Sequence, residues 1–144
     1  MANYVSNSVL FIGDPARVTE VQELFLQIQE KQAASKLYHL PDFVTCDRGH
    51  MRDIELNGEW INYETRWVPN LDLLQEIARH YELDFITGYE EATNWIYGEA
   101  VFTKNELHNI TLIAYDEEGW DDVPGFKAIR ELQASLLPGP QLKR

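Results

Sequence analysis

The sequence has 144 residues, 44% of them hydrophobic and 12% aromatic, which suits one domain with its own core and excludes a disordered chain. The 24 Asp and Glu residues outnumber the 12 Lys and Arg residues, and the formal net charge is −12. An acidic surface repels phosphate backbones, so we expect no direct contact with nucleic acid.

The chain opens with a predicted strand and a predicted helix. Residues 4–12 place apolar side chains on both faces, which is typical of a central strand. Asp14 then predicts a helix N-cap, with Pro15 at the first helical position. Apolar residues at helical spacing carry this helix to about residue 32. Residues 33–50 show no clean period and predict a long connection, either a mobile loop or a short extra strand.

A hairpin and a second helix follow. Asn57-Gly58 is the strongest hairpin signal in the chain. It separates weakly alternating residues 51–57 from a returning strand over residues 59–67. Apolar residues at helical spacing over residues 71–81 predict the second helix.

The remaining chain predicts three strands and a short helix. Residues 83–89, 93–103 and 108–115 have strand character, and the last two strands turn around residues 104–106. From Phe126 onward, apolar residues recur at helical spacing until Pro138-Gly139-Pro140 ends the pattern.

This order of elements predicts an α+β protein, a ferredoxin-like two-layer sandwich. Strand, helix, strand, strand, helix and strand match the split βαβ pattern, in which two helices cover one face of an antiparallel sheet. A C-terminal β-hairpin and a short helix extend this βαββαβ unit. We therefore expect a single domain over residues 1–144, with its core at about 2–103 and an acidic hairpin and tail at about 104–144.

Several short motifs resemble the YubB-like domain family. The opening Ala2-Asn3-Tyr4, before a first strand that ends at Gly13, is similar to the start of that family. Thr65, Trp67 and Pro69 stand in a segment that resembles the family's Thr-x-Trp-x-Pro motif, which leads into its second helix.

The resemblance to this family continues into residues 85–89 and 97–102, which are similar to its later strands. The family is bacterial, phage- and plasmid-associated and ferredoxin-like, without an established activity. The resemblance therefore implies the fold and a mobile-element origin, and it carries over no catalytic residue. The chain departs from the pattern at Val68 and Asn70, where the family often has Ser and a second Pro.

The acidic residues are concentrated in one part of the chain. Residues 82–122 hold 11 acidic residues against Lys104 alone, a net charge of −10, whereas residues 123–144 carry +3. Five carboxylates stand within seven residues: Asp116, Glu117, Glu118, Asp121 and Asp122. Such a cluster can be a solvated turn, a site for Ca²⁺ or Mg²⁺, or a surface that recognises a basic partner. We favour partner recognition over metal binding because the acidic excess extends back to Glu90.

Three aromatic residues are candidate anchors for a partner. If the face of the sheet that holds Phe102 packs against the helices, Trp95 and Tyr97 fall on the open face. Trp60 joins them, because Ile61, Tyr63 and Trp67 are the better core set in this strand. The tail helix or a second copy of the chain could cover these rings, since monomers rarely leave large apolar patches bare. A different protein is the functional alternative, because Trp and Tyr are good interface anchors.

The segment from Cys46 to His50 looks the most reactive. Cys46, Asp47 and His50 could supply metal ligands, or a nucleophile with its base. A structural zinc site needs four ligands, however, and the chain has one cysteine and otherwise isolated histidines. We therefore expect a loop cysteine beside solvated charges, and we assign no catalytic residue, metal ligand or cofactor.

The expected cellular compartment follows from three features that the sequence lacks: a second cysteine, a membrane span and a signal segment. One cysteine excludes a disulfide framework and fits a reducing environment. No apolar run approaches the length of a membrane span, and the N-terminus has no basic, apolar signal segment. We therefore expect a cytoplasmic protein without membrane contact.

These observations favour a non-enzymatic accessory protein that binds another protein through residues 82–122 and the aromatic face. In a sharper version, the carboxylates imitate DNA and occupy a nucleic-acid-binding protein. A homodimer is an alternative way to cover the aromatic face. The rival from another class is a divalent-metal-binding protein or an enzyme that uses residues 116–122, with Cys46 and His50 as further candidates.

Overall fold

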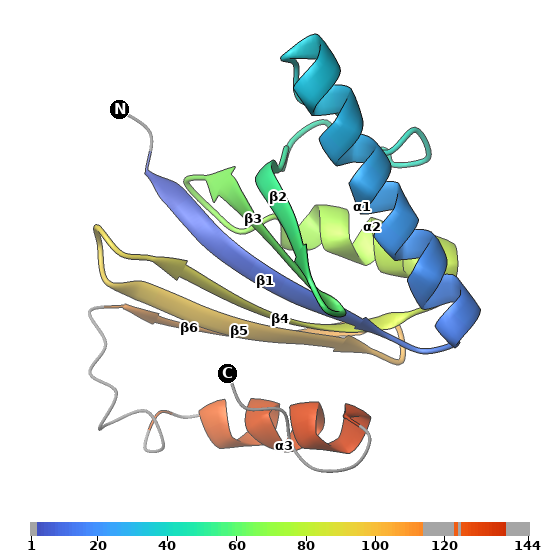
Figure 1. Cartoon of the computed structure of the whole chain (residues 1–144). Helices are drawn as coiled ribbons and strands as arrows, with labels where there is room; N and C mark the ends of the chain where they lie inside the picture. Colours follow the sequence, from blue (N-terminus) through green and yellow to red (C-terminus); the bar gives the residue numbers. More distant parts are fainter. Residues whose placement is uncertain (1–2, 114–122, 124, 138–144) are drawn as a thin grey trace.

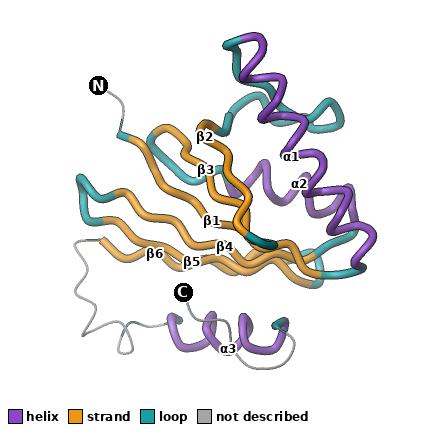
Figure 2. The backbone as a smooth tube through the Cα atoms, viewed as in Figure 1, coloured by secondary structure: helices purple, strands orange, loops and turns teal. Residues whose placement is uncertain are grey.

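The computed structural model describes residues 3–113, 123 and 125–137. Within these residues one antiparallel sheet has the strand order β2-β3-β1-β4-β5-β6. Helices α1 and α2 cover one face of the sheet, and α3 lies against the other (Figure 1; Figure 2). The predicted α+β class is confirmed. In chain order the elements are β1 (Tyr4–Ile12), α1 (Pro15–Ser35), β2 (Arg52–Asn57), β3 (Trp60–Arg66), α2 (Leu71–Tyr81), β4 (Asp84–Glu91), β5 (Ile96–Thr103), β6 (Glu106–Ile113) and α3 (Phe126–Leu136).

The main core lies between the sheet and helices α1 and α2. Phe11 of β1 contacts Phe25 of α1 and Phe85 of β4, with ring centroids 6.0 Å apart in each pair. Ile61 and Tyr63 of β3 are also buried in this cluster, as their position in the returning strand predicts. Trp67, which the same pattern places in the core, follows the end of β3 at Arg66 and is exposed, so that part of the prediction is wrong. Burial of this apolar surface is the main favourable contribution to folding.

The first helix begins where the sequence predicts and ends later. The Asp14 side chain accepts a hydrogen bond from the Ala16 backbone N–H at 3.2 Å, and Pro15 occupies the first turn. The helix continues to Ser35 because residues 32–34 are Gln-Ala-Ala, which favour helix. Residues 36–51 then form a long connection without a strand, which corrects the alternative of an extra strand.

The turns of the β2–β3 and β5–β6 hairpins use different chemistry. In the first hairpin Asn57 pairs with Trp60, so the loop is Gly58-Glu59 rather than the predicted Asn57-Gly58. Gly58 has φ 63°, a value that glycine adopts without strain. In the second hairpin Lys104 and Asn105 both have positive φ, which matches the twist of the flanking strands.

The connection between β4 and β5 corrects a predicted boundary. Strand β5 begins at Ile96 rather than at residue 93. The Glu91 carboxylate accepts hydrogen bonds from the Asn94 backbone N–H at 2.6 Å and from its side-chain amide at 3.0 Å. These bonds fix a turn in which Trp95 has φ 55°, so Trp95 belongs to the turn and not to the strand.

Helix α3 covers part of the second face of the sheet. Ile129 of α3 forms a small buried cluster with Ile86 of β4 and Val101 of β5. Figure 1 shows α3 lying across the side of the sheet away from α1 and α2. The face that the sequence leaves open is therefore partly closed by the chain's own tail helix.

Candidate functional site

A buried carboxylate links α3 to the sheet. Glu99 of β5 has no exposed surface. Its oxygens accept hydrogen bonds from Arg130 at 2.9 and 2.7 Å and from Gln133 at 2.8 Å, and Tyr97 donates a further hydrogen bond. Burial raises the pKa of Glu99, but the hydrogen bonds from Arg130, Tyr97 and Gln133 outweigh it and leave the pKa below its ordinary value. Glu99 is thus a charged attachment point for α3 and is not free to bind a partner.

The aromatic residues predicted as anchors have separate environments. Trp60 is half-buried and packs against the cluster beneath α3. Tyr97 is half-buried beside Glu99. Trp95 is 61% exposed. The predicted acidic residues Asp116, Glu117, Glu118, Asp121 and Asp122 lie outside the described residues.

Exposed apolar side chains gather at one end of the sheet. The register places the start of β1, the end of β3, the β4–β5 turn and the end of β6 at this end. Figure 1 shows these strand ends together, on the left of the view. Five of the eight large hydrophobic residues exposed in the described chain belong here, and we call them the apolar end: Tyr4, Trp67, Val68, Trp95 and Ile113.

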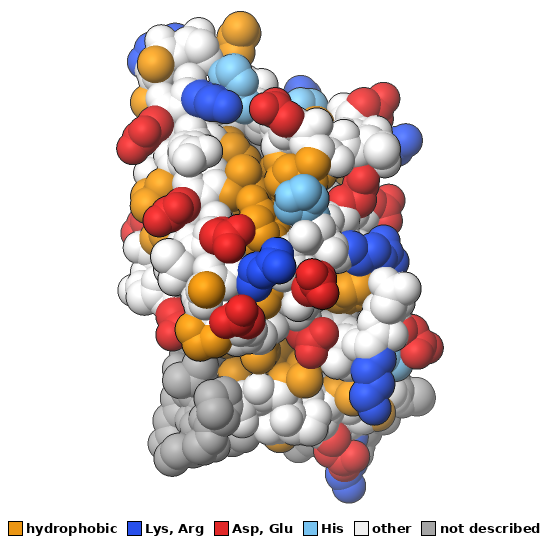
Figure 3. Space-filling view, turned by 90° about the vertical axis from the view of Figure 1, so that its right-hand side faces the viewer, with side chains coloured by type: hydrophobic (Ala, Val, Ile, Leu, Met, Phe, Trp, Pro, Cys, Tyr) orange, Lys and Arg blue, Asp and Glu red, His pale blue; other side chains and the backbone are white. Residues whose placement is uncertain are grey.

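The opposite end of the molecule has a different surface. Figure 3 views that end and shows Asp and Glu side chains interspersed with Lys and Arg around a strip of hydrophobic side chains.

Trp67 is held in an uncommon backbone conformation. It has φ 70°, which for a bulky residue is a genuine outlier. Three hydrogen bonds fix the turn: the Trp67 N–H donates to the Asn3 carbonyl at 2.7 Å, the Val68 N–H to the Arg66 carbonyl at 2.8 Å, and the Thr65 hydroxyl to the Val68 carbonyl at 2.7 Å. The Thr-x-Trp-x-Pro motif therefore builds a γ-turn that leaves Trp67 55% exposed.

The loop that contains Cys46 is tied to α2 at two points. Glu76 accepts hydrogen bonds from the Thr45 N–H and hydroxyl, both at 2.8 Å, and from the Cys46 N–H at 3.0 Å. These bonds lower the pKa of Glu76. Asn70 donates to the Gly49 carbonyl at 3.0 Å and accepts from the buried Tyr63 hydroxyl at 2.7 Å. A Cβ at Gly49 would lie 2.8 Å from the Asn70 Cβ, so this close approach favours glycine.

These contacts bring the loop and the turn together around one pocket. Its volume is about 480 Å³, and we call it the arginine pocket. Its lining comes from residues 46, 48–50 and 66–73 and includes Cys46, Arg48, His50, Arg66, Trp67 and Asp72. Sequence reasoning missed this site because the two segments are separate in the chain and the side chains that join them, Asn70 and Glu76, have no motif of their own.

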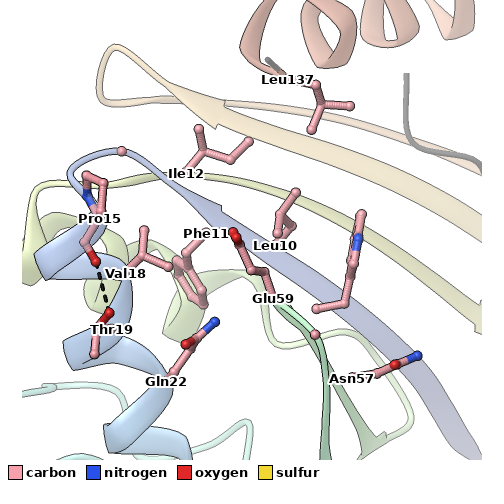
Figure 4. A pocket seen from close by; sticks show the side chains of 13 residues that line it. Leu10, Phe11, Ile12, Pro15, Val18, Thr19, Gln22, Asn57, Glu59 and Leu137 are labelled. Atoms are coloured by element: carbon pink, nitrogen blue, oxygen red, sulfur yellow. Dashed lines mark hydrogen bonds between the residues drawn. The ribbon is translucent and has the colours of Figure 1, made fainter. Parts of the chain in front are cut away.

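A second pocket, of about 570 Å³, lies at the other end of β1. Figure 4 shows Leu10 and Ile12 directed toward Leu137, with Val18 and Gln22 of α1 on the other side of β1. Most of the lining is hydrophobic, and Glu59 is its one ionisable residue. This pocket offers apolar volume with few polar groups that could orient a ligand.

The segment from Cys46 to His50 forms no metal centre in the described part of the chain. No group of three or more His, Cys, Asp or Glu side chains is positioned there to hold a metal ion. The Cys46 thiol donates to the Arg48 carbonyl at 3.2 Å. Among the described helices, none combines the length and hydrophobicity needed to cross a membrane.

The sheet and its helices define the class of protein. Residues 46–130, more than half of the chain, match the family described as the ferredoxin-like domain in Api92-like protein. The chain therefore belongs to this family, and the predicted ferredoxin-like class is confirmed. No match is found among curated proteins or among solved structures.

Proposed function

We propose that this protein binds a second protein through the apolar end of the sheet, with the acidic residues that follow β6 in the chain adding charge recognition. The observation that carries this proposal is the gathering of Trp67, Trp95 and Ile113 at one end of a sheet whose other described hydrophobic residues are mostly buried. Exposed Trp side chains are common anchors of protein interfaces.

Charge indicates the chemistry of the partner. Residues 82–122 carry a net charge of −10, and Asp116 stands three residues after Ile113. An acidic segment next to apolar anchors suits a partner with a basic surface, because complementary charge speeds encounter and selects against wrong partners. We still propose a protein partner, as the sequence predicts. The residues proposed to contact it are now those of the apolar end instead of Trp60 and Tyr97.

A more specific form of this proposal is that the acidic residues mimic DNA. The YubB-like resemblance implies a phage or plasmid origin, and the partner would then be a nucleic-acid-binding protein whose basic site the acidic residues occupy. In that case double-stranded DNA competes with this protein for the partner, and raised salt weakens both complexes.

Capture from host lysate tests the proposal. The wild-type chain is compared with a Trp95→Ser, Ile113→Ser variant and with a charge variant in which Asp116, Glu117, Glu118, Asp121 and Asp122 become Asn or Gln. We expect a basic protein that the wild type captures and both variants lose. A Leu26→Ser variant is the matched control, because Leu26 is 41% exposed on α1, away from the apolar end, and this variant should keep the partner. Equal capture by all four chains would contradict the proposal, and self-association lost in the apolar variant would replace it with a homodimer.

A further inference from the structure

The arginine pocket concentrates positive charge in an acidic protein. Two arginines, Arg48 and Arg66, line it together with one carboxylate, that of Asp72. The chain as a whole has twice as many acidic as basic residues. Among the residues that line the pocket, the ratio of basic to acidic side chains is therefore the reverse of that in the whole chain.

Neither Arg48 nor Arg66 forms a strong contact within the described part of the chain. In the described part of the chain, Arg66 forms no ion pair or hydrogen bond through its side chain. Arg48 has one ion pair, with its neighbour Asp47 at 3.9 Å, and both side chains are largely exposed. Such exposed pairs contribute little free energy, so Arg48 can turn to another anion. Arg17, Arg52 and Arg130, by contrast, each pair with a carboxylate outside this pocket.

Trp67 is the one aromatic residue of the indole or phenyl type in the lining of the pocket. Its γ-turn is fixed by the Asn3 and Val68 contacts, and the Thr65 hydroxyl is itself held by the buried Asn7 amide at 3.1 Å. A backbone outlier that the surrounding structure maintains at a concave site is a reason to look for function there. The other side of the pocket is equally fixed, because Asn70 ties Gly49 to α2.

We propose that the arginine pocket binds a small organic anion that carries a flat ring. The guanidinium groups of Arg66 and Arg48 hold its carboxylate or phosphate, which guanidinium binds through paired hydrogen bonds. The Trp67 indole packs against its ring. A pocket of about 480 Å³ is of the size that accepts molecules of this class.

This inference does not depend on the protein partner proposed above, although Trp67 and Val68 belong to both surfaces. Arg48 and Arg66 are not needed for the apolar end, and Trp95 and Ile113 do not line the pocket. Loss of one activity without the other can therefore be measured.

Calorimetric titration of the full chain tests the inference with four probes. Adenosine monophosphate and indole-3-acetate carry both a ring and an anionic group, whereas adenosine lacks the anion and inorganic phosphate lacks the ring. We expect at least one of the first two probes to bind with a Kd below about 1 mM, and both controls to bind at least about tenfold more weakly. Failure of both ring-bearing anions to bind more tightly than the controls would overturn the proposal.

Variants then locate the binding site. Arg66→Gln should weaken binding of the tighter probe by about tenfold or more, and Trp67→Gly should reduce it to the level of inorganic phosphate. Arg17→Gln is the matched control, because Arg17 is a partly exposed arginine paired with Glu82 at 3.6 Å outside the pocket. Equal effects of Arg66→Gln and Arg17→Gln would place the anion elsewhere and overturn the assignment. Trp95→Ser, Ile113→Ser should leave probe binding unchanged, which separates this result from the partner experiment.

Discussion

At the scale of single residues, backbone strain at Trp67 has a measurable consequence. A non-glycine residue in the left-handed region costs about 1–2 kcal/mol, whereas glycine adopts it freely. We expect Trp67→Gly to be more stable than Trp67→Ala by about 1 kcal/mol, because both remove the indole and differ only in the Cβ. Urea unfolding of the two variants measures this difference. A less stable glycine variant would mean that Trp67 is not held at positive φ in solution.

Gly98 is a second residue whose replacement has a clear expected effect. A Cβ at this position would lie 2.0 Å from the Tyr89 ring, which crosses Gly98 to reach Asn109 and Thr111 on β6. Tyr89 is 3% exposed and cannot move aside without breaking these bonds. We therefore expect Gly98→Ala to reduce the free energy of unfolding by about 2–3 kcal/mol. Gly58→Ala is a useful comparison, since nothing lies within 4 Å of a Cβ there and its cost comes from φ alone.

At the scale of elements, the attachment of α3 should depend on pH. The pKa of Glu99 is below its ordinary value in the folded protein, so the folded state binds its proton less readily than the unfolded state does. Its contribution to stability is complete above the ordinary carboxyl pKa of about 4.5 and is lost as the pH falls from there through the lowered value. Acid should therefore weaken the contact between α3 and β5.

Comparison of the wild type with Glu99→Gln measures this effect. At pH 7 we expect the variant to be less stable by about 2 kcal/mol, because it loses charge-assisted hydrogen bonds to a buried group. The difference should shrink as the pH is lowered below about 4.5, since protonation removes the same charge from the wild type. A difference that stays constant over this range would contradict the assigned role of Glu99.

Some helices and strands could be predicted from the sequence, and the position of others could not. The capped start of α1, the alternating β3 and the spacing of apolar residues in α2 are local signals, and each was readable in the chain. The sequence offers the tail helix as one cover for the open face of the sheet, beside a second copy of the chain and a different protein. The choice of α3 among these covers was not readable. It depends on Glu99, Arg130 and Gln133 meeting across more than 30 residues of sequence, and no local pattern records such a contact.

The candidate site was predicted less well than the fold for the same reason. Trp95 was identified as an anchor and is exposed, although it lies in a turn rather than on the strand. Arg66 and Trp67 stood inside a recognised motif, but their proximity to the loop of Cys46 follows from two long-range contacts, through Asn70 and Glu76. Hydrogen-bonding side chains of this kind leave no periodic signal.

At the scale of the whole molecule, the two proposed binding surfaces lie close to each other. The end seen in Figure 3 has charged residues of both signs around a strip of hydrophobic side chains, and the exposed Trp95 and Ile113 lie at the other end. The arginine pocket lies beside the apolar end because Trp67 and Val68 contribute to both. This arrangement predicts that a protein partner and a small anion would approach neighbouring surfaces of the molecule.

The most direct test of binding through the apolar end is amide hydrogen exchange of this protein, alone and in complex with a partner that it captures. We expect the partner to slow exchange at the β4–β5 turn, around Trp95, and at the end of β6, around Ile113, and to leave α1 unchanged. Slowed exchange confined to α1 and α2, with none at the apolar end, would contradict this mode of binding.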